Sequence, residues 1–231
     1  MEDWKAARVV KANEILVFAK SLLVNVPPDK IKNRIERILW LMKKVVSLVP
    51  ENVEIQNTVS TSLMMLGQID EAAAVMSSAV KNSLPDAPPF LLATTYNNLS
   101  VCLVLLGDFT GAMRNVSQAV KLNPRSALFW SQQGTCFLLL GDLEKALDSL
   151  ETALILEPRS PELLHQCAGI NFLLRNTNKA LEQINQAIAL ADEESQRRPQ
   201  YLAFRERVRG AISGNKNDEK SASGRRSRTL H

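Results

Sequence analysis

The sequence has few of the side chains that enzymes and metal centres rely on. Its 231 residues include two histidines and three cysteines, and no glycine-rich phosphate loop. His231 ends a polar segment, where nothing would hold an imidazole in a catalytic geometry. His165 and Cys167 are two residues apart, which on a helix places them on nearly opposite sides rather than on one metal-binding face. We therefore predict a protein that is not an enzyme and that holds no metal and no cofactor.

Long apolar runs are also missing. Hydrophobic residues make up 45% of the chain, yet no run of them approaches the roughly 20 residues needed to span a bilayer. The apolar residues 15–19 are followed at once by Lys20, and the acidic residues before them argue against a secretory or mitochondrial signal. The odd number of cysteines favours buried thiols in a reducing compartment. We predict a cytoplasmic protein with no membrane partner.

The net charge of +4 is small for a protein that binds nucleic acid. Residues 213–231 contain five basic and two acidic side chains, so the rest of the chain carries only about one net positive charge. A general nucleic-acid surface needs a concentrated excess of basic residues, and this balance disfavours it. Because residues 213–231 are almost free of apolar side chains, we expect a disordered basic tail there.

What the chain does contain is a period of 34 residues through its middle. Aromatic, Gly-Asp, alanine and proline positions all recur at this spacing. A shared register across such different residue types is typical of a stack of helix pairs rather than of one closed globule. The repeated pairs are Tyr96 and Trp130, Gly107 and Gly141, Ala112 and Ala146, Ala119 and Ala153, and Pro124 and Pro158.

Each of these positions has a physical role in a stack of helix pairs. Small residues such as Gly134 and Ala146 let two antiparallel helices approach closely. Gly107 and Gly141 allow the turn within a pair, because glycine adopts left-handed backbone angles without strain. Pro124 and its counterpart in the next unit stop the second helix before the next pair begins.

The pattern resembles that of the tetratricopeptide repeat family. Residues 127–160 match it best and residues 93–126 match it well, whereas the flanking units 53–81 and 161–192 match it less closely. The last of these units has Arg175-Asn176 where the family has Gly-Asp. The resemblance implies an all-α fold, a right-handed α–α superhelix that forms a tetratricopeptide repeat solenoid.

The pattern also predicts how the chain is divided. Residues 1–50 would form an N-terminal helical hairpin or divergent repeat, 51–194 about four repeats, 195–212 a capping helix and 213–231 the tail. Gly67 and Gly107 are 40 residues apart, so about six extra residues separate the first two clear units. They fall in the proline-rich residues 83–89, where we expect a protruding loop.

The resemblance further implies where a partner binds. In tetratricopeptide proteins the first helix of every pair lines a concave groove, which commonly holds an extended peptide or a helix. Polar side chains in such a groove can hydrogen-bond the backbone of a bound peptide. The resemblance brings Gly169 and eight side chains towards it: Asn57, Thr61, Asn97, Asn98, Val101, Ser131, Thr135 and His165.

We therefore expect a protein–protein interaction module that acts as an adaptor, a scaffold or a complex-assembly subunit. Two alternatives stay open. One is an assembly chaperone for an unstable client, and the other is an RNA-binding helical-repeat protein, a class that usually has a basic groove. Family members that clamp the acidic tails of heat-shock chaperones use lysine and arginine, but Leu128 and Gln132 stand at those positions, which disfavours that partner. The sequence carries no signal for an oligomeric state.

Overall fold

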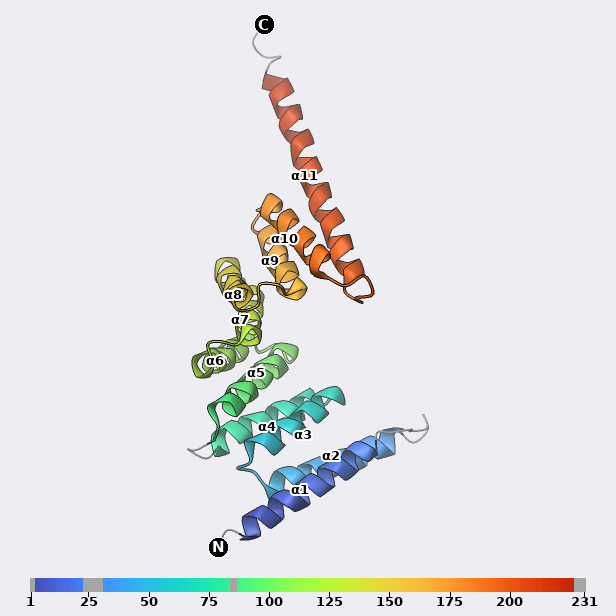
Figure 1. Ribbon diagram of the computed structural model, residues 1–231, viewed down its shortest axis with the longest axis vertical. Helices are drawn as coiled ribbons and strands as arrows, with labels where there is room; N and C mark the ends of the chain where they lie inside the picture. The colour runs from blue at the N-terminus through green and yellow to red at the C-terminus, as the bar shows by residue number, and fades with distance from the viewer. Residues whose placement is uncertain (1–2, 23–30, 84–86, 227–231) are drawn as a thin grey trace. The chain divides into compact units, whose positions relative to one another are not determined.

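The protein is helical throughout the described part of the chain. The computed structural model describes residues 3–22, 31–83 and 87–226, and these form eleven helices and no strand (Figure 1). The predicted all-α fold is confirmed. The chain divides after Pro124 into two compact units, each with apolar cores of its own.

Six helices make up the first unit, and they pair in sequence order as helical hairpins, α1 with α2, α3 with α4 and α5 with α6. Buried residues three, four and seven positions apart, such as Ile38, Met42 and Val45 on α2, turn one face of each helix to the core. The helices are α1 (Asp3–Ser21), α2 (Ile31–Leu48), α3 (Val53–Met65), α4 (Ile69–Asn82), α5 (Pro89–Leu105) and α6 (Phe109–Leu122).

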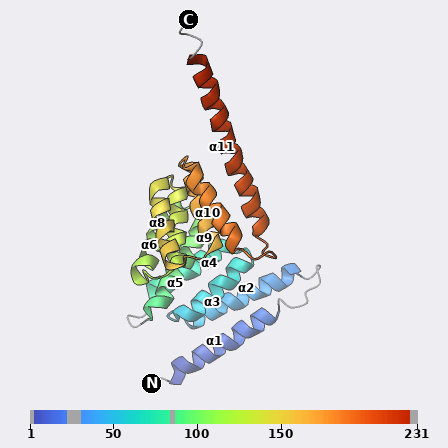
Figure 2. The same cartoon turned by 45° about the horizontal axis from the view of Figure 1, so that its top comes forward.

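Five helices make up the second unit. Here α7 pairs with α8 and α9 with α10, while α11 packs on α10 (Figures 1 and 2). The last turns of α11 extend past the α9–α10 pair in both views. The helices are α7 (Ala127–Leu139), α8 (Leu143–Leu156), α9 (Pro161–Leu173), α10 (Thr177–Leu190) and α11 (Arg198–Arg226).

The turn inside each helix pair uses one residue in the left-handed region. Gly67, Gly107 and Gly141 have φ angles of 74°, 82° and 85°. Arg175 occupies the equivalent position of the last pair with a φ of 65°, and its backbone N–H donates to Phe172 O as the Gly141 N–H donates to Leu138 O. The turn at Arg175 therefore has the same shape as the glycine turns, although a side chain there costs energy.

Replacing Arg175 by glycine should therefore stabilise the second unit. We expect Arg175→Gly to raise the free energy of unfolding by about 0.5–1 kcal/mol, because the relief of left-handed strain exceeds the added entropy of the unfolded chain. Urea titration followed by circular dichroism measures this. Arg175→Ala is the matched control, since it removes the same side chain and keeps the strain; equal stability of the alanine and glycine variants would contradict the strain argument.

The small residues of the period lie where two helices meet. Ala146 and Ala153 on α8 are fully buried. A Cβ atom added at Gly134 on α7 would lie 2.9 Å from Leu150 Cγ and 3.1 Å from Ala146 O, so only glycine fits this crossing of α7 and α8. The close contact that the sequence predicts for Gly134 and Ala146 is confirmed by these distances.

The ends of two elements differ from the boundaries that the sequence indicates. Helix α11 continues to Arg226, past the predicted boundary at residue 212, because residues 213–226 contain no proline to interrupt the backbone hydrogen bonds. Residues 227–231 of the predicted tail lie outside the described residues. In the predicted loop 83–89, residues 84–86 also lie outside them, and α5 begins at Pro89, a residue suited to the first turn of a helix.

Candidate functional site

Five of the eight predicted groove residues lie in the first unit, on α3 and α5. The Asn57 amide donates to Leu91 O over 3.4 Å and so links the two helices. Asn97 is only 4% exposed, and its amide donates to Asn98 Oδ1 over 3.5 Å. Thr61 is exposed, but its hydroxyl donates to Asn57 O, while Val101 is half-buried. The amide groups of Asn57 and Asn97 thus donate within the unit itself, whereas their buried Oδ1 atoms accept no hydrogen bond.

The other three predicted residues lie in the second unit, on α7 and α9. The Ser131 hydroxyl donates to Gln166 Oε1 over 2.8 Å, which joins the two helices at the surface. Thr135 and His165 line one pocket with a volume of about 430 Å³. The second unit therefore places predicted residues around a hollow that is large enough to receive a side chain.

Three helices and the edge of a fourth form the walls of this pocket. Helix α9 provides one wall, α7 faces it, α11 closes one side, and Leu150 of α8 contributes from behind Gly134. The lining residues are Gly134, Thr135, Leu138, Leu150, His165, Gln166, Gly169, Ile170, Phe172, Leu173, Phe204 and Arg207.

Gly169 has an unusual position in the wall of this pocket. A Cβ atom added there would meet no heavy atom within 4 Å, in contrast to Gly134, where it would collide with Leu150. Helix packing therefore does not require glycine at position 169. The absence of a side chain instead widens the pocket, because a larger residue on this face of α9 would project into it.

His165 packs against two aromatic rings of α11. Its imidazole centroid lies 4.9 Å from the Tyr201 ring and 5.4 Å from the Phe204 ring, with the second pair edge to face. Burial, followed by the positive charge of Arg197, lowers the pKa of His165 below its ordinary value of 6.5. His165 is therefore neutral at pH 7 and behaves as an aromatic wall with one donor and one acceptor.

One positive charge lies at the rim of the pocket. The Arg207 guanidinium carbon is 5.9 Å from the ring centroids of both Phe172 and Phe204, so the cation lies beside two aromatic faces. Phe172 and Phe204 are themselves edge to face, with centroids 5.7 Å apart. The pocket thus combines an apolar interior with a guanidinium that can pair with a carboxylate or a carbonyl oxygen.

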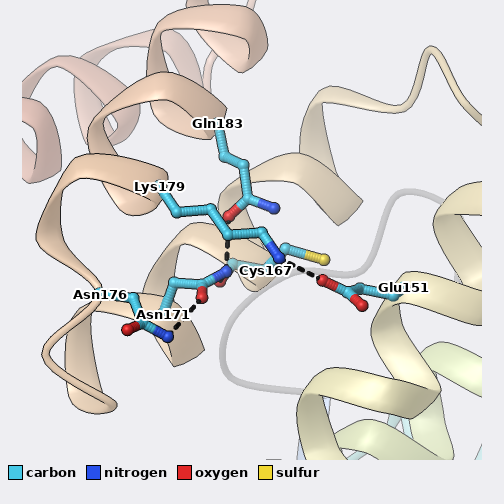
Figure 3. A network of polar contacts seen from close by, with 6 residues as sticks. All are labelled: Glu151, Cys167, Asn171, Asn176, Lys179 and Gln183. Carbon is cyan, nitrogen blue, oxygen red and sulfur yellow. Dashed lines mark hydrogen bonds and ion pairs between the residues drawn. The ribbon is translucent and has the colours of Figure 1, made fainter.

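A buried polar network fixes the face of α9 that packs on α10 (Figure 3). Asn171 has no exposed surface, and its amide donates to Gln183 Oε1 over 2.9 Å and to Cys167 O over 3.2 Å. The Asn176 amide donates to Asn171 Oδ1 over 3.3 Å. Satisfied buried polar groups of this kind restrict how two helices can slide. The network thereby helps to fix the wall of the pocket that α9 provides.

An ion pair beside this network ties α10 to α8. Lys179 Nζ lies 2.7 Å from Glu151 Oε1, and both side chains are partly exposed (Figure 3). The Cys167 thiol lies in the same region, where burial and the charge of Glu151 raise its pKa to about 12. Cys167 therefore stays protonated at neutral pH.

The sequence did not indicate that α11 takes part in the pocket. Phe204 and Arg207 lie outside the 34-residue period, so the repeat register gave no reason to group them with His165. The 35 residues between Ser131 and Gln166 were a usable signal, because this spacing brings one helical face against the next. The repeat pattern alone does not predict the hydrogen bond from Ser131 to Gln166.

The described residues offer neither a metal-binding cluster nor a membrane-spanning helix. Within residues 3–22, 31–83 and 87–226, no three His, Cys, Asp or Glu side chains gather closely enough to hold a metal ion. Among the helices that the structure describes, none has the length and apolar character required to cross a membrane.

The helices form successive pairs, and the turn within each repeated pair contains one left-handed residue. This arrangement is that of a helical-repeat protein. Comparison with known families identifies the repeat: residues 103–161 match the tetratricopeptide repeat family. Residues 103–161 therefore carry tetratricopeptide repeats. No curated protein matches the sequence.

Solved structures share the fold at low sequence identity. TTC0263, a thermophilic TPR protein of Thermus thermophilus, is 23% identical, with a TM-score of 0.61 over 83% of this chain and 97% of that chain. YrrB, described as a TPR protein with an unusual peptide-binding site, is 19% identical, with a TM-score of 0.61 over 83% and 90%. PilF of Pseudomonas aeruginosa is 14% identical, with a TM-score of 0.64 over 97% and 94%. These likenesses show the fold that the sequence predicts.

Proposed function

We propose that the protein is a non-enzymatic interaction module whose second unit binds a segment of a partner protein in the pocket between α7, α9 and α11. The observation that carries this proposal is the pocket itself, about 430 Å³ in volume and lined by the first helices of two repeats and by α11. Tetratricopeptide repeats are built to present such surfaces to other proteins. That YrrB is described as having a peptide-binding site supports a peptide as the occupant.

The lining of the pocket favours one bulky apolar side chain of the bound segment. Leu138, Ile170 and Phe172 offer apolar contact, and the neutral ring of His165 extends it. Around this interior, Thr135 and Gln166 can hydrogen-bond the backbone on either side of the inserted residue. Ser131 donates to Gln166 Oε1, which leaves the amide nitrogen of Gln166 oriented to donate to a peptide carbonyl.

An adaptor, scaffold or assembly subunit binds other proteins and catalyses no reaction. The side chains of the second unit suit that role. Burial holds the Cys167 thiol protonated, so it is not activated as a nucleophile. The described cysteines are free and buried, which favours a cytoplasmic location for the protein.

Filling the pocket from Gly169 tests the proposal. Gly169→Met should place a flexible side chain in the hollow, block the partner and weaken its binding by about tenfold or more. The fold should not suffer, because a Cβ there meets nothing within 4 Å and loss of a helical glycine is favourable by about 0.5–1 kcal/mol. Partners are first identified by affinity purification and mass spectrometry, and are then titrated against parent and variant.

Gly210→Met is the matched control. Gly210 is also a helical glycine with nothing within 4 Å of an added Cβ, but it does not line the pocket. We expect the control to retain full affinity. Undiminished binding to a folded Gly169→Met variant, or equal loss with Gly210→Met, would remove the pocket as the partner site.

A further inference from the structure

The first helix of the chain has apolar residues on two opposite faces. Ala12, Leu16 and Ala19 are buried against the rest of the first unit. On the other side of α1, Val10 and Val17 are seven residues apart, and Val17 is 69% exposed. A helix that is apolar on both faces is usually covered on both. No other described element covers the outer side of α1, which therefore lacks a partner within the described structure.

Exposed aromatic rings accompany these valines, and each lies beside a cation. The Arg37 guanidinium carbon is 5.5 Å from the Phe18 ring centroid, which joins α1 to α2 on this surface. One turn further along α2, Trp40 is 60% exposed, and the Lys44 ammonium is 5.1 Å from its ring. Trp4 on α1 is likewise half exposed, with the Arg8 guanidinium carbon at 5.2 Å. We call the surface that these residues share the hairpin face: Val10, Val17, Phe18, Arg37, Trp40 and Lys44.

The positive charge of the protein is concentrated in this hairpin. Residues 1–50 contain ten basic and five acidic side chains, a net charge of +5, whereas residues 51–212 contain thirteen basic and seventeen acidic ones, a net charge of −4. The small total charge of the chain hides this asymmetry. The hairpin face is thus both apolar and basic, and a partner that covers it must be apolar and acidic.

We propose that the hairpin face binds an acidic amphipathic helix of a partner protein. The apolar stripe of such a helix would cover Val10, Val17 and the aromatic rings, and its carboxylates would pair with Arg37 and Lys44. This contact is independent of the pocket in the second unit, because it uses different helices and a different chemistry.

One acidic residue on the hairpin face favours a protein partner over a lipid surface or RNA. A shallow hollow on α1 is lined by Val10, Asn13, Val17 and Phe18, and Glu14 lies among them. A carboxylate at this place repels the phosphates of a lipid surface or of RNA, whereas a partner helix can set one lysine against it. A second copy of the chain is disfavoured, because two faces with the same positive charge would repel each other.

A designed peptide tests this proposal on the full-length chain. The probe is a labelled helical peptide of about 18 residues, or five turns, with leucines three and four positions apart, glutamates on the flanks and one lysine. Fluorescence anisotropy measures its binding. We expect the peptide to bind about tenfold or more tightly than a scrambled peptide of the same composition or a version with lysine in place of glutamate.

Variants of the exposed face locate the binding. Trp40→Ala, and the double change Arg37→Glu with Lys44→Glu, should each weaken the acidic peptide by about tenfold or more without loss of helix content. Met65→Ala and Lys81→Glu are the matched controls, since both residues are exposed on other helices of the same unit, and they should leave binding unchanged.

Three other results would overturn the proposal. The first is equal binding of the scrambled peptide. The second is binding to phosphatidylserine-containing vesicles or to a single-stranded RNA of about 20 nucleotides that exceeds binding to the peptide and is lost in Trp40→Ala. The third is dimerisation of the chain, seen by sedimentation equilibrium, that Trp40→Ala abolishes.

Discussion

Tyr201→Ala should lower the free energy of unfolding of the second unit by about 3–5 kcal/mol, because it removes a large buried ring from the junction of three helices. Tyr201 is 2% exposed and is part of the apolar core formed by Leu164, Ala168, Ile184 and neighbouring residues of α9 and α10. Its ring also stacks on His165. Loss of the ring leaves a cavity that short alanine and long leucine side chains around it cannot fill without moving α11.

Chemical denaturation of the chain measures this loss, with the helical signal as the readout. Tyr201→Phe is the matched control, since it keeps the ring and removes only the hydroxyl, and we expect it to cost far less than the alanine variant. Because Phe204 and Arg207 lie on the same helix, Tyr201→Ala should also open the pocket and weaken a partner bound there. A midpoint of Tyr201→Ala close to that of the parent would show that α11 does not seal the last repeat.

Residues that constrain the backbone allowed most of the fold to be predicted. Gly107 and Gly141 indicate left-handed turns, and Gly134 indicates a close helix crossing. Other residues meet these requirements only with strain. Such constraints act locally and recur with every repeat. The register of the helix pairs therefore follows from the sequence before any contact between them is known.

The left-handed turn at Arg175 could not be predicted from the residue type, because arginine adopts that region of backbone angles only at a cost. The Arg175 and Asn176 N–H groups make the same backbone hydrogen bonds as in the glycine turns, and the last turn adds one from the Asn176 side chain to Asn171 Oδ1. A network of this kind depends on residues from two helices, so a local pattern does not reveal it.

The candidate site was predicted in part, for a related reason. The periodic positions Thr135 and His165 line the pocket, and Gly169 lies one turn from His165, but Phe204 and Arg207 come from a helix outside the repeats. Asn97 occupies a groove position by register and is nevertheless only 4% exposed. Register gives the face of a helix on which a residue lies, whereas exposure depends on what the next element covers.

Ala146→Leu should lower the free energy of unfolding by about 1–3 kcal/mol, because it overpacks the contact between α7 and α8. Ala146 is fully buried on α8 and lies against α7 at Gly134, where even one added carbon would come within 3.1 Å of its carbonyl oxygen. Three further carbons at Ala146 would have to displace α7 or adopt strained side-chain angles. Displacement of α7 also moves Thr135, and with it one wall of the pocket.

Thermal unfolding separates this steric effect from a change in helix propensity. Ala189→Leu is the matched control, because Ala189 is exposed on α10 and the same substitution there adds bulk only to the surface. We expect the control to remain within about 0.5 kcal/mol of the parent. An equally small loss of stability in Ala146→Leu would show that α7 and α8 are not packed as closely as the 34-residue period predicts. The predicted repeat register would then be wrong.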